Sequence, residues 1–64
     1  SCVGSQGTVY LDIPEGGIGE IRVIVSDVVT YVKARAAGGA ALKAGLPVRV
    51  THILEVTLVE VEPI

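Results

Sequence analysis

The sequence predicts an all-β protein, a single small five-stranded barrel. Apolar and polar residues alternate with a period of two along most of the chain, which is typical of strands with one buried face. Val and Ile dominate the apolar residues, and Gly and Pro separate the alternating segments. A length of 64 residues allows one domain. Five short strands are too few for a two-sheet sandwich, but they are enough to close a barrel.

The first alternating segment covers residues 7–13. Its period of two predicts that Val9, Leu11 and Ile13 face inward. Pro14 and the glycines after it end the strand, because Pro lacks a backbone donor and Gly permits positive φ. The outward positions are Thr8, Tyr10 and Asp12.

The next two segments, residues 19–25 and 28–36, are predicted to form a hairpin. With Ser26 and Asp27 at the turn, Ile21 faces Val32 on the inward side, and the inward and outward sets agree across the whole pair. The same register pairs Val25 with Val28 inward, and Glu20 with Lys33, Arg22 with Tyr31 and Ile24 with Val29 outward.

A second hairpin is expected from residues 48–53 and 56–62, after a Gly-rich loop at residues 37–47. A single helical turn at residues 40–44 is the alternative for part of that loop. Leu54 and Glu55 make a poor tight turn, so a bulge or a slip of one residue is expected there. The predicted pairs are Val48 with Val61 and Val50 with Val59 inward, and Arg49 with Glu60 outward.

Charge and hydropathy exclude several classes of function. No apolar run approaches the ~18 residues of a membrane-spanning helix. Five Lys and Arg against seven Asp and Glu give a net charge of −2, which argues against nucleic acid as the partner. The chain begins with Ser, and we expect it to be part of a longer protein.

Catalytic and metal-binding machinery is not recognisable in the sequence. His52 and Cys2 are the only residues of their types, too few for a zinc site, and no serine stands in a nucleophile motif. His52 is expected to be half-buried with its ring bonded to backbone. Glu60 and Glu62 are expected on an outward rim rather than in an acid–base pair. We therefore predict a domain that is not an enzyme and that needs no cofactor.

The predicted binding surface is the outward face of the first hairpin, around Ile24, Val29 and Tyr31. A small barrel needs only one apolar face per strand, so apolar residues gathered on the outer face need an explanation. Either a protein partner or a second copy binds there, or the loop after Ala36 or the N-terminal segment covers it. The polar rim of the surface is expected from Glu20, Arg22 and Lys33.

Most of the chain resembles the soluble C-terminal domain of NfeD-type membrane proteins. One departure is the last turn, where the family often has Gly and this chain has Leu54 and Glu55. The motifs that carry the resemblance are Gly-Ser-Gln-Gly-Thr-Val at 4–9, Asp-Ile-Pro-Glu-Gly-Gly-Ile-Gly-Glu-Ile at 12–21, Ala-Arg-Ala at 34–36, Leu-Lys-Ala-Gly at 42–45, Val-Arg-Val at 48–50 and Val-Glu-Val-Glu-Pro at 59–63.

The resemblance implies a five-stranded OB-like barrel at residues 1–64, tethered to membrane helices outside this sequence. It implies stomatin- or flotillin-type protein partners and a role in membrane organisation, membrane-protein quality control or the regulation of a membrane protease. The cytoplasm is the expected location of the domain. The serine protease domain of longer members has no counterpart in this chain.

Two alternatives use other residues. The start Cys-Val-Gly-Ser-Gln-Gly at residues 2–7 resembles that of HypC-type hydrogenase-maturation chaperones, which implies a metallochaperone that uses Cys2. A weak single-stranded nucleic-acid binder would stack bases on Tyr31, beside Arg22, Lys33 and Arg35.

Overall fold

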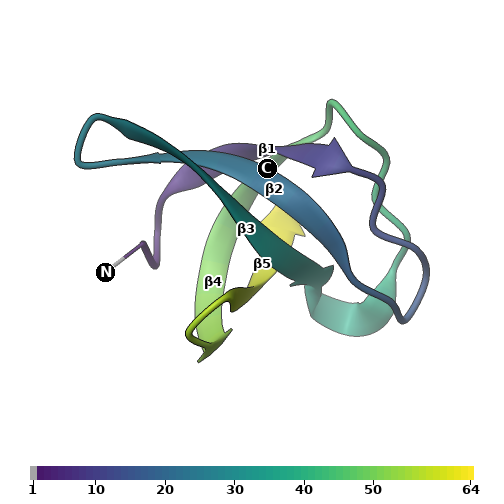
Figure 1. Cartoon of the computed structure of the whole chain (residues 1–64). Coiled ribbons are helices and arrows are strands. Elements are labelled where there is room, and N and C mark those ends of the chain that lie inside the picture. Colours follow the sequence, from purple (N-terminus) through teal and green to yellow (C-terminus); the bar gives the residue numbers. More distant parts are fainter. Residues whose placement is uncertain (1) are drawn as a thin grey trace.

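The computed structural model describes residues 2–64, so Ser1, the first residue of the expected domain, lies outside the described residues. The strands close into a barrel in the order β1-β2-β3-β5-β4, with β3 and β5 parallel and all other neighbours antiparallel (Figure 1). The all-β barrel that the sequence predicts is confirmed. The elements are β1 (Gln6–Leu11), β2 (Gly19–Val25), β3 (Val28–Ala36), the short 3-10 helix η1 (Ala37–Gly39), β4 (Pro47–Glu55) and β5 (Leu58–Pro63).

The hairpin of β2 and β3 has the predicted register from end to end, with Gly19 opposite Ala34 at one end and Val25 opposite Val28 at the other. Ser26 and Asp27 form the turn with φ values of 50° and 64°. Two consecutive left-handed residues are the mark of a type I′ turn, whose twist matches that of the two strands. The turn therefore fixes the register that the alternation indicates.

In β1 the inward expectation holds for Val9 and Ile13 but is wrong for Leu11, which is 53% exposed. A bulge between Val9 and Leu11 shifts the pairing with β2 and turns Leu11 out of the barrel. The strand ends at Leu11, and Ile13 forms an isolated bridge with Leu42 through two backbone hydrogen bonds of 2.8 Å. Both of these bridge residues are buried.

The predicted register of β4 and β5 is wrong, by four residues beside the turn and by two at Val48–Val50, and the turn lies at residues 56–57 rather than 54–55. Two irregularities in the pairing, after Val50 and after Ile53, each take up one extra residue of β4 and so reduce the offset from four residues to two. An offset of two residues leaves the side chains at Val48–Val50 on their predicted faces, because side chains alternate with a period of two. Between the two irregularities the offset is odd, and His52 lies on the outer side with Glu60. The inward valines are as predicted, although the observed pairs are Val48 with Pro63, Arg49 with Glu62 and Val50 with Val61.

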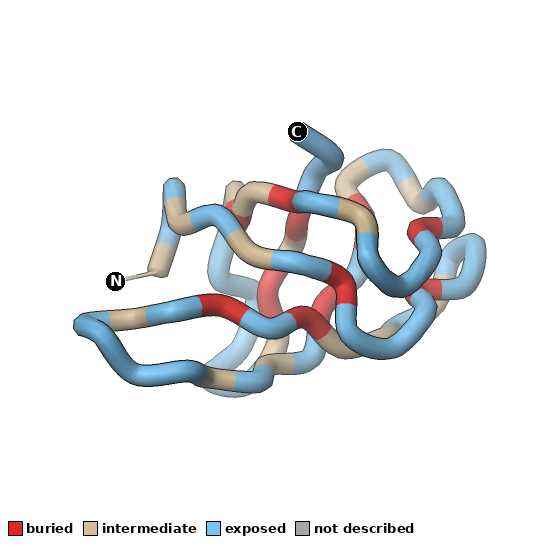
Figure 2. The backbone as a smooth tube through the Cα atoms, turned by 90° about the horizontal axis from the view of Figure 1, so that it is seen from above, coloured by how far each residue is buried: buried red, intermediate tan, exposed pale blue. Residues whose placement is uncertain are grey.

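The core is a single cluster of apolar, mostly β-branched side chains inside the barrel. Such side chains pack well on pleated strands. Figure 2 shows the backbone positions of the buried residues in red. The loop between β3 and β4 closes one end of this core through Leu42, and its helical turn is η1 rather than residues 40–44. The buried residues are Val9, Ile13, Ile21, Val23, Ala34, Ala36, Leu42, Val48, Val50, Val59 and Val61.

The β2–β3 hairpin has two halves with different neighbours. β1 pairs with β2 only as far as Val23, and β5 pairs with β3 only over residues 33–36. We call residues 24–32, beyond these pairings, the distal half of the hairpin, and the remainder of β2 and β3 its proximal half. Figure 1 shows the distal half projecting away from β4 and β5.

Candidate functional site

The three residues predicted to bind a partner lie together on the outer side of the distal half. Ile24 is 55%, Val29 45% and Tyr31 50% exposed, and Ile24 is directly opposite Val29. Their exposure follows from the alternation, since their strand neighbours Val23, Val25 and Val32 face the interior. The structure thus brings the predicted residues to one surface. Their role in binding stays a prediction.

Tyr10 joins this surface from β1. Its ring lies 4.8 Å from that of Tyr31, centroid to centroid, at an interplanar angle of 62°, which is an edge-to-face contact. Sequence reasoning placed Tyr10 outward but did not bring it to Tyr31. Thr8 pairs with Arg22 and Arg22 with Tyr31, so the three strands place these side chains on one outer face. The pairing of β1 with β2 joins separate segments, and the alternation within each strand does not indicate it. We call Tyr10, Ile24, Val29 and Tyr31 the outer patch.

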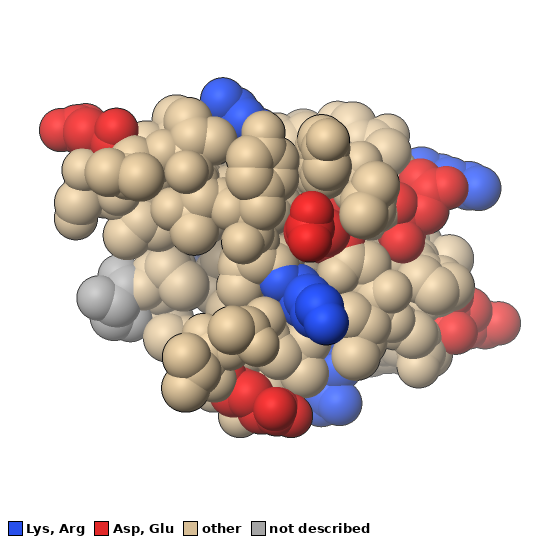
Figure 3. Space-filling view, viewed as in Figure 1, with Lys and Arg blue, Asp and Glu red and all other residues tan. Residues whose placement is uncertain are grey.

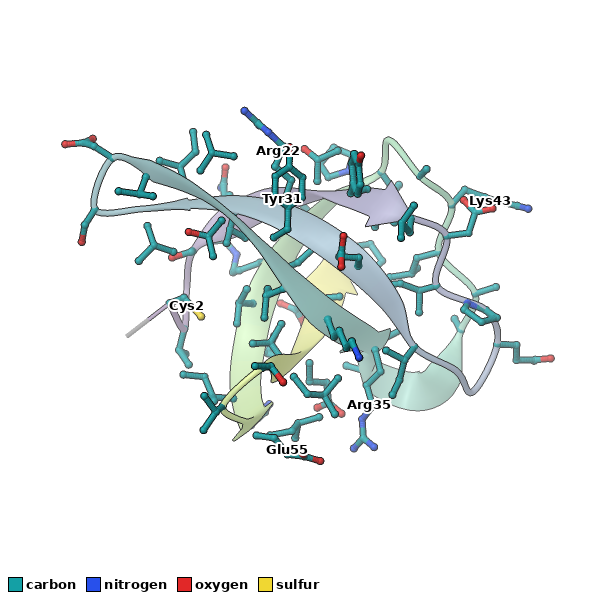
Figure 4. The ribbon with its side chains drawn as sticks, viewed as in Figure 1. Cys2, Arg22, Tyr31, Arg35, Lys43 and Glu55 are labelled. Atoms are coloured by element: carbon teal, nitrogen blue, oxygen red, sulfur yellow. The ribbon has the colours of Figure 1, made fainter. Side chains whose placement is uncertain are left out.

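Polar side chains surround the outer patch. Arg22 and Lys33 are exposed and Glu20 is half-buried, all on the same outer face of β2 and β3. Figure 4 shows Arg22 and Tyr31 on the same side of the sheet, far from Arg35 at the other end of β3. In Figure 3 charges are scattered over this view, with a broad uncharged area over the projecting hairpin. An apolar centre with a charged rim is the usual anatomy of a protein–protein interface.

A shallow hollow of about 290 Å³ adjoins the patch. Thr8, Arg22, Ile24 and Ile64 are among the residues that line it. Gly7 forms part of its floor, and there is no room for a side chain at that position, since a Cβ would lie 2.5 Å from the Arg22 carbonyl oxygen. The hollow gives the otherwise convex outer face a recess next to Ile24.

Neither segment that was considered as a cover lies over the outer patch. The loop after Ala36 turns back to β1, where Leu42 bonds to Ile13. The N-terminal segment runs along β4, with the Gly4 amide donating to the Val50 carbonyl and the Val50 amide to the Ser5 carbonyl. Both segments are therefore held elsewhere, and the patch stays exposed.

Cys2, the residue of the metallochaperone alternative, packs against the core and is half-buried. It lines an apolar hollow of about 300 Å³ at the open end of the barrel, together with Val25, Val32, Ile53 and Val56. Within residues 2–64 no group of three or more His, Cys, Asp or Glu side chains is placed to hold a metal ion.

Glu60 is the centre of a small polar cluster on β3, β4 and β5. Its carboxylate accepts a hydrogen bond from Arg35 Nε at 3.2 Å and lies 3.4 Å from His52 Nδ1. His52 is expected from the sequence to be half-buried, with its ring bonded to backbone. This expectation is wrong, because the side chain is 70% exposed and its ring nitrogen contacts the Thr51 hydroxyl. The outward expectation for Glu60 and Glu62 holds, but Arg49 lies opposite Glu62. Through these contacts the cluster links the side chains of β3, β4 and β5.

The fold and its surface define a small OB-like barrel with an apolar, charge-rimmed outer face. The family description of the NfeD C-terminal domain matches residues 6–62, and the chain belongs to this family. A search of the curated proteins gives no match. No helix among the described residues is long and apolar enough to cross a membrane.

Two solved structures are similar in fold. The soluble domain of the NfeD protein YuaF from Bacillus subtilis has a TM-score of 0.81 at 23% identity, over 94% of this chain and 70% of that one. The C-terminal domain of stomatin operon partner protein 1510-C from Pyrococcus horikoshii has a TM-score of 0.79 at 24% identity, over 98% of this chain and 88% of that one. Membership of the NfeD family favours the first resemblance over the HypC-type alternative.

Proposed function

We propose that this domain is a non-catalytic interaction module that binds a stomatin- or flotillin-type protein through the outer patch. The observation that carries the proposal is the exposure of four large apolar side chains on one face, which neither neighbouring segment covers. Family membership supports the class of partner, since one relative with the same fold is named a stomatin operon partner protein.

The chemistry of the patch suits a protein partner. Tyr10 and Tyr31 brace each other edge to face, so a partner meets rings that are already oriented. Aromatic side chains with few rotatable bonds dominate the energetics of many interfaces. Ile24 and Val29 add aliphatic surface beside them, and Arg22 and Lys33 supply charges at the rim that select a complementary partner.

The proposed setting is a membrane. In this proposal the domain is the soluble part of a membrane-anchored NfeD-type protein, expected on the cytoplasmic side. It would bring its partner to the membrane, where the two proteins would act in membrane organisation or in membrane-protein quality control, including the regulation of a membrane protease. The support is the family of the chain and the stomatin-related name of its structural relative.

The test compares binding to a stomatin-type protein before and after the apolar surface is removed. Ile24→Glu with Val29→Lys places opposite charges at two paired positions and preserves their cross-strand complementarity. We expect the double variant to stay folded. Its dissociation constant, measured by calorimetry, should rise at least about tenfold, which corresponds to a loss of about 1.4 kcal/mol of binding free energy at a hot spot.

The matched control changes two exposed aliphatic residues outside the patch, Ile18→Glu with Val56→Lys. Their exposed fractions are 53% and 98%, and the same charges are introduced. This variant should bind as the wild type does. Unchanged binding by the Ile24–Val29 variant, or equal loss by both variants, would contradict the proposal. Unfolding of the first variant would show that the patch is core.

A single-stranded oligonucleotide serves as a second ligand in the same experiment. Because the chain carries a net charge of −2, any binding should be weak and should fall steeply as salt is raised. Sub-micromolar binding at ~150 mM salt would favour the nucleic-acid alternative at Tyr31 over the protein partner.

A further inference from the structure

We propose that two copies of this chain pair through the free edges of their β3 strands, antiparallel and about a twofold axis at Thr30. The paired stretch is residues 28–32 of each copy. This inference concerns the edge of the sheet, whereas the proposed function concerns its outer face, so each can hold without the other.

The first observation is the unpaired edge itself. β3 pairs with β2 over residues 28–34, but on its other side β5 covers only residues 33–36. In a hairpin with a two-residue turn, the flanking pair Val25–Val28 exchanges hydrogen bonds, and so does every second pair after it. The backbone groups of Val29 and Tyr31 therefore point away from β2, and no described strand faces them.

The second observation is that this edge lacks the protection that edge strands usually carry. Natural edges are guarded by charges, prolines, bulges or a covering segment. Residues 28–32 read Val-Val-Thr-Tyr-Val, with no charge and no proline, and their pairing with β2 is regular. The far part of β4 is different, since it has two irregularities in its pairing and the charged Glu55. The β3 edge is thus suited to pairing with another strand.

The third observation selects a second copy as the occupant. A twofold axis at Thr30 pairs the whole free stretch with itself and sets Val29 opposite Tyr31 of the second copy, so that their outward backbone groups meet. The same register brings Asp27 of each copy to the end of the paired stretch, next to the point where Lys33 of the other copy begins to pair with Leu58 of its own chain. Among the described residues, neither Asp27 nor Lys33 takes part in an ion pair within its own chain.

Pairing in this way would produce one four-stranded sheet, in the order β2-β3-β3-β2, across the two copies. The two outer patches would then lie side by side on the same face of that sheet. A partner with two equivalent binding sites would engage both patches at once, and its overall affinity would rise without any new contact.

Sedimentation equilibrium at low salt tests the pairing. The apparent mass should rise above the 6.6 kDa of one chain as concentration increases. Asp27→Lys and Lys33→Glu each replace opposite charges by like charges at both ends of the interface. Each should raise the dimer dissociation constant at least about tenfold. The matched controls Glu15→Lys and Lys43→Glu make the same charge changes in exposed positions away from β3 and should dimerise as the wild type does.

A mixture of the Asp27→Lys and Lys33→Glu variants gives the sharpest result. The two lysines of the first variant, at positions 27 and 33, would face the two acidic residues of the second, at positions 33 and 27. The equimolar mixture should therefore form a heterodimer although each variant alone is weakened. Amide hydrogen exchange adds a local readout, since Val29 and Tyr31 should be protected at high concentration and lose protection on dilution. If Asp27→Lys does not fold, because left-handed backbone suits Lys less well than Asp, Lys33→Glu and the exchange data decide.

A wild-type chain that stays monomeric at ~1 mM, where even weak specific pairing is populated, would overturn the proposal. So would a wild-type dimer that neither charge reversal weakens, since its interface would lie elsewhere on the barrel.

Discussion

The proximal and distal halves of the β2–β3 hairpin share the same two strands, the same alternation and one continuous register. In the proximal half Ile21 and Ala34 are fully buried, because β1 and β5 continue the sheet on both sides. In the distal half Val25 and Val32 are only partly buried, and Val28 at the turn is 62% exposed. The two halves differ in their neighbours rather than in their local sequence pattern.

This difference shows how a small barrel can provide both a core and an interaction surface from one hairpin. Where both flanking strands are present, the inward face is sealed and the outward face can be polar. Where the flanking strands end, the same strands present apolar side chains and unpaired backbone groups to solvent. The proposed partner site and the proposed dimer edge both lie in this distal half.

The largest expected effect is on a buried residue of the proximal half. Ile21→Ala removes a fully buried side chain and should lower the free energy of unfolding by about 2–5 kcal/mol, measured by urea denaturation. The matched substitution on the same strand, Ile24→Ala, should cost less than about 0.5 kcal/mol, because Ile24 is exposed. Equal losses would show that the distal half is core as well.

A somewhat smaller loss is expected at the boundary between the halves, where Gly7 faces Val23 in the last pair of β1 and β2. An added Cβ in Gly7→Ala would lie 2.5 Å from both the Arg22 carbonyl oxygen and a Val23 methyl carbon. We expect a destabilisation of about 1–3 kcal/mol by thermal unfolding. A control substitution, Ser5→Ala, should have little effect. A stable Gly7→Ala domain would mean that β1 and β2 can separate there without cost.

A stabilising change is expected at the tip of the distal half. Ser26 and Asp27 both have left-handed backbone, which Asn and Gly adopt more readily in a type I′ turn. Ser26→Asn with Asp27→Gly should raise the free energy of unfolding by about 0.5–1 kcal/mol in dilute solution. No gain would indicate that the turn is not what holds the distal half in register.

The smallest effect is expected where the proximal half meets β5. Arg35→Gln removes the 3.2 Å ion pair with Glu60, which is partly exposed on the Arg35 side. The expected loss is about 0.2–1 kcal/mol, shrinking as salt screens the pair. Arg22→Gln at the edge of the outer patch is the control and should be neutral. A loss well above 1 kcal/mol would show that the Glu60 cluster holds the barrel closed.

The sequence predicts one hairpin better than the other for a physical reason. In β2 and β3 the alternation is unbroken and a two-residue turn leaves a single register that satisfies both faces. In β4 and β5 the irregularities after Val50 and Ile53 each change the pairing, and alternation alone cannot count the extra residues. The same limitation misplaced Leu11, which a bulge in β1 turns outward.

The candidate site could be predicted only in part. The exposure of Ile24, Val29 and Tyr31 follows from the hairpin register, which the sequence determines. The contribution of Tyr10 depends on how β1 pairs with β2, a contact between separate segments. The free edge of β3 depends on where β5 begins to pair, at Lys33, and no pattern within β3 indicates that point.

The most direct test of the account is a nuclear magnetic resonance titration of the isotope-labelled domain with a stomatin-type protein. If the outer patch binds the partner, the largest amide shift changes will fall on Tyr10, Ile24, Val29 and Tyr31, with little change around Glu60. Changes centred on Glu60 and its neighbours, with the outer patch unaffected, would contradict the account and place the binding surface on the other side of the barrel.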